Sequence, residues 1–179
     1  MNYTVQTRIQ TKVRIFALLA CCLGFLAACG FTPLYGQNGV DGKGVTAQFN
    51  DIQISNIPDR SGQILRNALI DRFYTHGRPV DATYTLNIPS IKETVTDLDI
   101  TKNSDATRAQ LILETSLILL DNQSGKAVLK RNLHAITSYN ILQSQFTTRI
   151  SEQSARENAL QDLARQVEMQ LGLYFKRAQ

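Results

Sequence analysis

The sequence predicts an α+β domain in which two helices pack on one face of a four-stranded, mainly antiparallel sheet, in the order β-α-β-β-β-α. Two observations carry this prediction. Residues 107–120 and 127–140 are long runs of alternating or β-branched apolar residues, and a polar segment with a glycine separates them. Two other stretches, near residues 59–76 and 154–175, repeat apolar residues at helical spacing. Such a mixture favours helices layered on a sheet.

The first strand and the first helix are expected between residues 45 and 77. Apolar residues alternate along 45–54, and the alternation changes parity near Asn50, which predicts a strand with a bulge. A proline then ends the strand, and Asp59 or Ser61 is expected to cap the helix that follows. Apolar residues form one stripe of this helix until Gly77, so the helix is expected to lie on the sheet.

The remaining strands are expected to follow without a helix between them. Residues 83–95 alternate as a strand that Pro89 interrupts, because proline has no N–H for the ladder. Residues 96–105 are polar and predict a turn. The runs 107–120 and 127–140 then predict a long hairpin.

The last helix is the clearest local pattern. Residues 143–150 predict a polar linker, and Ser154 with Glu157 three residues later has the form of a capping box. Apolar residues then recur at helical spacing as far as Tyr174. A second amphipathic helix is therefore expected from Ser154 onward.

The N-terminal residues have the form of a lipoprotein export signal. Three basic residues, Arg8, Lys12 and Arg14, precede an apolar run at 15–26 that is too short to cross a bilayer. Leu26-Ala27-Ala28-Cys29 follows, in the form of a lipobox. We expect residues 1–28 to be a signal peptide, Cys29 to carry the lipid, 29–44 to be a flexible tether and 45–179 to be one periplasmic domain. An ordinary cleavage site beside an incidental cysteine is the alternative.

Charge and cysteine content exclude several classes of function. Three of the 19 Lys and Arg precede Cys29 and all 15 Asp and Glu follow it, so loss of the signal lowers the formal charge from +4 to +1. This balance argues against a nucleic-acid partner. Cys21 and Cys22 lie within the signal, so the mature chain has no thiol for a disulfide, a metal or a nucleophile. The two histidines, His76 and His134, stand in no zinc-binding pattern. We expect no catalytic residue, no metal and no cofactor.

Three segments carry a resemblance to a known family. Cys29 to Gly36 reads CGFTPLYG directly after the lipobox, Ser138-Tyr139-Asn140 closes the long hairpin, and the last helix ends in LGLYF at 171–175. In this the chain resembles the LPS-assembly lipoproteins (LptE) of alphaproteobacteria. The resemblance implies a palmitate-type lipid anchor on the periplasmic face of the outer membrane and a partner β-barrel, LptD, whose lumen the lipoprotein plugs. Gly30 stands where inner-membrane lipoproteins often carry Asp, which agrees with the outer membrane.

The resemblance also implies lipopolysaccharide-binding residues. Family members place basic residues in the turn between the second and third strands and just before the last helix, where this chain has Lys102 and Arg149. Lys and Arg suit anionic phosphates and sugars, with which they form charge-assisted hydrogen bonds. Two other functions remain open at this point. One is an adaptor lipoprotein of a different envelope complex, and the other is a hydrolase that uses a serine with His134 or His76.

Overall fold

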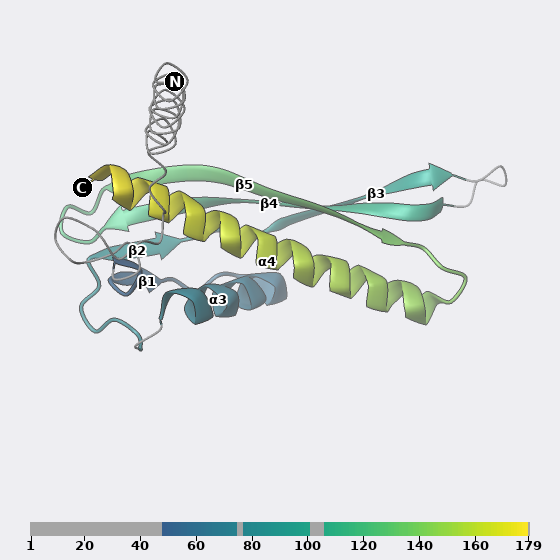
Figure 1. Ribbon diagram of the computed structural model, residues 1–179, viewed down its shortest axis with the longest axis horizontal. Helices are drawn as coiled ribbons and strands as arrows, with labels where there is room; N and C mark the ends of the chain where they lie inside the picture. The colour runs from purple at the N-terminus through teal and green to yellow at the C-terminus, as the bar shows by residue number, and fades with distance from the viewer. Residues whose placement is uncertain (1–47, 75–76, 101–105, 179) are drawn as a thin grey trace, which may run out of the picture. The chain divides into compact units, whose positions relative to one another are not determined.

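The computed structural model describes residues 48–74, 77–100 and 106–178 (Figure 1). Its helices are α3 (Asp59–Phe73) and α4 (Gln145–Ala178). Its strands are β1 (Ile52–Ile54), β2 (Tyr84–Asn87), β3 (Lys92–Ile100), β4 (Ala106–Asp121) and β5 (Ala127–Asn140). These elements confirm the predicted α+β class, with five strands instead of four.

The fifth strand results from an interruption that the sequence marks at Pro89. β2 and β3 both pair antiparallel with the same edge of β4, β2 with residues 118–121 and β3 with residues 106–114. Residues 88–91 separate the two strands. β5 pairs with the other edge of β4, and β1 lies parallel to β2. The sheet is therefore four strands wide, and proline splits its second strand because it cannot donate to the ladder.

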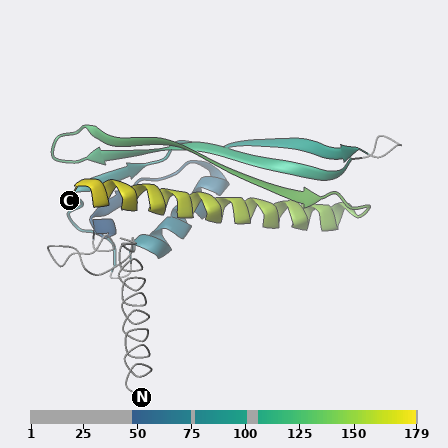
Figure 2. The same cartoon turned by 45° about the horizontal axis from the view of Figure 1, so that its top comes forward.

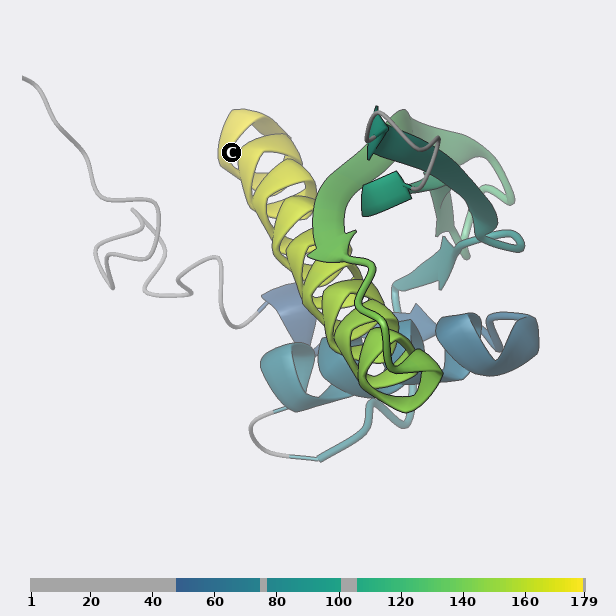
Figure 3. The ribbon, with the colours of Figure 1, turned by 90° about the vertical axis from the view of Figure 1, so that its right-hand side faces the viewer.

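Both helices lie on one side of the sheet (Figures 2 and 3). α4 runs along β5 and β4, and α3 packs against α4 and near β1. The odd-numbered leucines of β4 face the helices, and Leu163, Val167 and Leu171 of α4 meet them without solvent exposure. Burial of a leucine contributes about 1.5–3 kcal/mol, so this stripe of α4 is the main contact between the two layers.

The start of the domain departs from the predicted first strand. β1 covers only three residues, and Gln48 and Phe49 form a helical turn before it. Phe49 stacks on Phe73 of α3 at a centroid distance of 4.8 Å, which holds this turn against the core. Tyr74 then occupies the outer edge of β1, because its hydroxyl accepts from Ile54 N at 3.1 Å and donates to Ile52 O at 2.9 Å. Val45 and Ala47 lie outside the described residues.

The predicted start of α4 and the predicted cap of α3 are wrong. α4 begins at Gln145, so most of the predicted linker 143–150 is helical and Ser154 lies inside the helix. Ser144 caps it instead, accepting at Oγ from Thr147 N at 3.5 Å. α3 begins after Pro58 without a side-chain cap. Asp59 has φ +65° and its carboxylate accepts from Ser90 Oγ at 2.8 Å, which takes it away from the helix terminus.

β3 is also longer than the sequence predicts. The polar residues 96–100 were expected in a turn, but they continue the strand and pair with β4 as far as Ile100 opposite Ala106. Backbone pairing does not depend on side-chain polarity, and an edge strand tolerates charged residues. The rest of the predicted turn, residues 101–105, lies outside the described residues.

Candidate functional site

Four chain segments meet at one end of the sheet, which we call the distal end. β3 ends there at Ile100, β4 begins at Ala106, β5 ends at Asn140 opposite Arg108, and α4 begins five residues later. Ile141 N donates to Thr107 O at 2.9 Å and so extends the β4–β5 ladder by one bond. The strand pairing therefore brings the end of β3, the start of β4 and the end of β5 to the same end of the sheet.

Arg149 lies on the second turn of α4 at the distal end, with its side chain exposed. α4 extends past α3 here (Figures 1 and 2). Phe146 and Ile150 stand one turn apart on this extension and are 74% and 49% exposed. The basic residue is therefore helical, not in a linker as predicted, and large apolar side chains flank it. Lys102 lies outside the described residues, between the end of β3 and the start of β4.

Arg156 fixes this extension to the sheet. Its guanidinium bonds both carboxylate oxygens of Glu93 on β3, with Nη2–Oε1 at 2.6 Å and Nε–Oε2 at 3.0 Å, and also bonds Glu152 at 2.6 Å. The hydrogen bonds that Arg156 donates to Glu93 are the main reason that the pKa of Arg156 is raised. This contact between α4 and β3 was not predicted from the sequence. The i,i+4 spacing of Glu152 and Arg156 was the available signal.

The face of the sheet opposite the helices is covered by no described element. Even-numbered residues of β4 point to this open face, where half-buried Ile112, Ile118 and Leu120 alternate with polar neighbours. Lys92 and Glu114 form an exposed ion pair across the strands at 3.4 Å. The open face is thus neither fully polar nor a continuous apolar patch.

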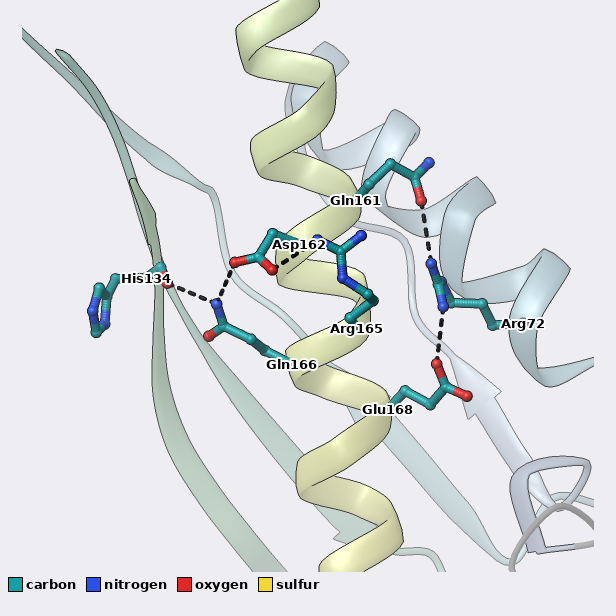
Figure 4. Close-up of polar contacts among 7 residues, drawn as sticks. All are labelled: Arg72, His134, Gln161, Asp162, Arg165, Gln166 and Glu168. Carbon is teal, nitrogen blue, oxygen red and sulfur yellow. Dashed lines mark hydrogen bonds and ion pairs between the residues drawn. The ribbon is translucent and has the colours of Figure 1, made fainter. Parts of the chain in front are cut away.

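Polar contacts of α4 close the free edge of β5 and join the two helices (Figure 4). Gln166 Nε2 donates to the backbone carbonyl of His134 at 2.9 Å and to Asp162 at 2.8 Å. On the other side of the helix, Arg72 of α3 pairs with Glu168 at 3.0 Å. The imidazole of His134 points away from α4 (Figure 4). The contact of His134 with the helix is therefore made by its backbone.

The described residues do not include two of the other residues named in the sequence analysis. Cys29 and His76 lie outside them. Within residues 48–74, 77–100 and 106–178, no group of three or more His, Cys, Asp or Glu side chains could hold a metal ion. No helix in the same ranges is both long and apolar enough to cross a membrane.

These features define a small α+β binding domain, with one open sheet face and a distal end that combines basic and apolar side chains. The chain belongs to the LptE lipopolysaccharide-assembly family, whose model matches residues 49–171. Membership gives it a role in lipopolysaccharide assembly and agrees with a non-catalytic protein of the cell envelope. No curated protein matches the chain.

Three solved structures of similar fold are described as lipoproteins. One from Caulobacter crescentus CB15 aligns with a TM-score of 0.60 at 21% identity, covering 76% of this chain and 98% of that one. Rare lipoprotein B from Shewanella oneidensis aligns at 0.56 and 11% identity, covering 71% and 96%. A minor lipoprotein from Acinetobacter baumannii aligns at 0.56 and 21% identity, covering 69% and 92%. At these identities the likeness concerns the fold.

Proposed function

We propose that this chain is an outer-membrane lipoprotein that plugs the lumen of an LptD-type β-barrel and helps insert lipopolysaccharide into the outer membrane. Residues 1–28 are its signal peptide, Cys29 carries the lipid on the periplasmic face, 29–44 form the tether and 45–179 the plug. It acts by binding and assembly, without catalysis or a cofactor. The observation that carries the proposal is the family match over residues 49–171.

The open sheet face supports the plug. A domain inside a barrel meets protein on most sides and yet must be exported as a soluble chain, which an entirely apolar face would hinder. Small apolar groups among polar neighbours, such as the cross-strand pair of Ile112 and Ile136, satisfy both conditions. The ion pair of Lys92 and Glu114 is exposed on the same face and is of the kind found at an interface rim.

Arg149 and Lys102 are the proposed lipopolysaccharide-binding residues. Lys102 stands in the sequence between Ile100, where β3 ends, and Ala106, where β4 begins, and both of these residues lie at the distal end. Phosphates of lipid A attract both side chains, and Arg binds phosphate in a bidentate manner. Phe146 and Ile150 stand beside Arg149 and offer apolar surface to a ligand that is part lipid.

The plug is tested by affinity purification of the lipidated protein from detergent-solubilised outer membranes. We expect a large β-barrel in roughly stoichiometric amount. Recovery of the protein alone would remove the plug from consideration, and recovery with an unrelated envelope complex would favour the adaptor function. Substitution of Cys29→Ala is expected to release the chain from the membrane fraction.

The ligand site is tested by Lys102→Glu combined with Arg149→Glu. We expect weaker binding of lipopolysaccharide and an intact barrel complex. The matched control is Lys126→Glu with Arg165→Glu, which reverses two exposed charges elsewhere. Equal binding by both double variants would show that the distal residues are not the site. The hydrolase alternative is tested separately, because it requires His134→Ala or His76→Ala to abolish function.

A further inference from the structure

The chain enters the described domain at the end opposite Arg149, which we call the proximal end. Phe49, the second described residue, packs on Phe73 and lies 6.4 Å from the ring of Phe175 near the end of α4. α4 contains 34 residues, so its two ends are about 50 Å apart. Nineteen positions separate Cys29 from Gln48. Along the chain, the proximal end is therefore the part of the domain nearest to the proposed lipid.

A basic and apolar surface lies at this proximal end. A pocket of about 230 Å³ is lined by Leu129 and Arg131 of β5 and by Gln170, Leu173, Tyr174 and Arg177 of α4. Met169, Leu173 and Arg177 follow one another at four-residue spacing, and the first two are 45% and 37% exposed. We call Arg131, Met169, Leu173 and Arg177 the proximal patch. It combines two guanidinium groups with exposed apolar side chains on one surface.

The charges of the proximal patch are not neutralised within the described part of the chain. Arg131 donates to the neighbouring carbonyl of Lys130 at 2.8 Å, and no described acidic side chain forms an ion pair with Arg131 or Arg177. After Glu168, α4 contains no acidic residue. The nearby Asp121 accepts from Ser124 N at 2.7 Å within its own turn, which lowers the pKa of that carboxyl. Basic residues at the end of a helix suit its dipole, but Arg131 comes from a strand and has no such role.

We propose that the proximal patch binds the anionic phospholipid headgroups of the leaflet that holds the lipid anchor. The proposal rests on the anchor at Cys29 but not on the barrel or on lipopolysaccharide. Guanidinium groups pair with lipid phosphates, while Met169 and Leu173 enter the boundary between headgroups and acyl chains. The anchor alone leaves the domain free to rotate, and this second contact fixes which end faces the membrane.

The test is flotation of the mature chain, carrying Cys29→Ala, with vesicles that contain neither lipopolysaccharide nor a barrel. The described core lies between Phe49 and Phe175, so removal of the lipid leaves it intact. We expect binding to vesicles of phosphatidylethanolamine with phosphatidylglycerol and little binding to phosphatidylcholine alone. Arg131→Gln with Arg177→Gln is expected to weaken binding about 25-fold, and Arg177→Gln alone about fivefold.

The matched control is Arg60→Gln with Arg108→Gln, which removes two exposed charges that belong neither to the proximal patch nor to the proposed lipopolysaccharide site. Binding of the control should equal that of the parent chain. Equal losses of binding in both double variants would mean that only net charge matters, and this would overturn the proposal. Equal binding of the parent chain to both kinds of vesicle would also overturn it, and so would no binding to either kind. Because these vesicles lack the barrel, failure here leaves the plug untouched, and failure to recover a barrel leaves this result standing.

Discussion

Replacement of Arg156 by methionine should loosen the part of α4 that carries Arg149. Arg156 holds the first turns of the helix against β3 through hydrogen bonds to both carboxylate oxygens of Glu93, and it bonds Glu152 within the helix. The side chains of Arg156 and Glu93 are 25% and 30% exposed, so solvent screens the pair only in part. An exposed pair contributes about 0.2–1 kcal/mol and a hydrogen bond to a charged group about 1.5–3 kcal/mol. We expect a loss of about 1–2 kcal/mol, because methionine retains the apolar stem of the arginine.

The effect is measured by urea denaturation together with amide hydrogen exchange. Exchange should accelerate in residues 145–155 more than in 160–171, since the second stretch is held by the core. The control is Arg165→Met, which removes one exposed ion pair with Asp162 and should cost less than about 0.5 kcal/mol. Equal stability losses in the two variants, or uniform exchange along α4, would refute the reasoning that Arg156 acts as the local clamp.

Three further outcomes follow from the packing. Gly62→Ala should destabilise by about 1–2 kcal/mol in urea, although alanine favours helix, because its Cβ would lie 2.9 Å from the backbone of Ile57. Leu163→Ala should cost about 2–5 kcal/mol, since Leu163 is fully buried, whereas the same change at Leu173 should cost much less. Burial, and then the charge of Glu152, raise the pKa of Tyr139. The neutral phenol of Tyr139 therefore stabilises the folded state below about pH 10, and this stabilisation is lost as the pH rises further. A phenolate absorbance titration of the parent chain, compared with that of the Tyr139→Phe variant, measures the pKa of Tyr139.

Much of the fold is predictable from the sequence because its strongest patterns are long. The hairpin of β4 and β5 and the apolar stripe of α4 extend over many residues. Along each of them, apolar residues recur on the same face at the spacing of a strand or of a helix. Pro89 identifies the break between β2 and β3 because proline has no N–H to donate to the ladder, whatever packs around it. The short β1 and the uncapped start of α3 involve contacts between distant residues, such as Phe49 with Phe73 and Asp59 with Ser90. A single sequence without structure does not contain that information.

The candidate site is less predictable because its geometry depends on the position of α4. Arg149 was expected in a linker, where its neighbours would have no fixed orientation. Once α4 begins at Gln145, Phe146 and Ile150 stand beside Arg149 at helical spacing. The clamp of Arg156 on Glu93 joins residues that are 63 positions apart, and only the register of β3 brings them together. The apolar neighbours and the clamp were therefore missed for the same reason.

The length of α4 connects the two proposed binding surfaces. Arg149 and Arg177 are 177 − 149 = 28 residues apart in this helix, which is about 42 Å along its axis, and a bilayer with its headgroups is about 40–45 Å thick. If the proximal patch lies on the periplasmic leaflet and the domain stands upright in a barrel, Arg149 reaches the headgroup level of the outer leaflet. Charged side chains at that level meet lipopolysaccharide phosphates without crossing hydrocarbon, where each charge would be costly. A helix of half this length would leave the distal residues at the membrane centre, so the plug function and the distal ligand site together require a helix about as long as α4.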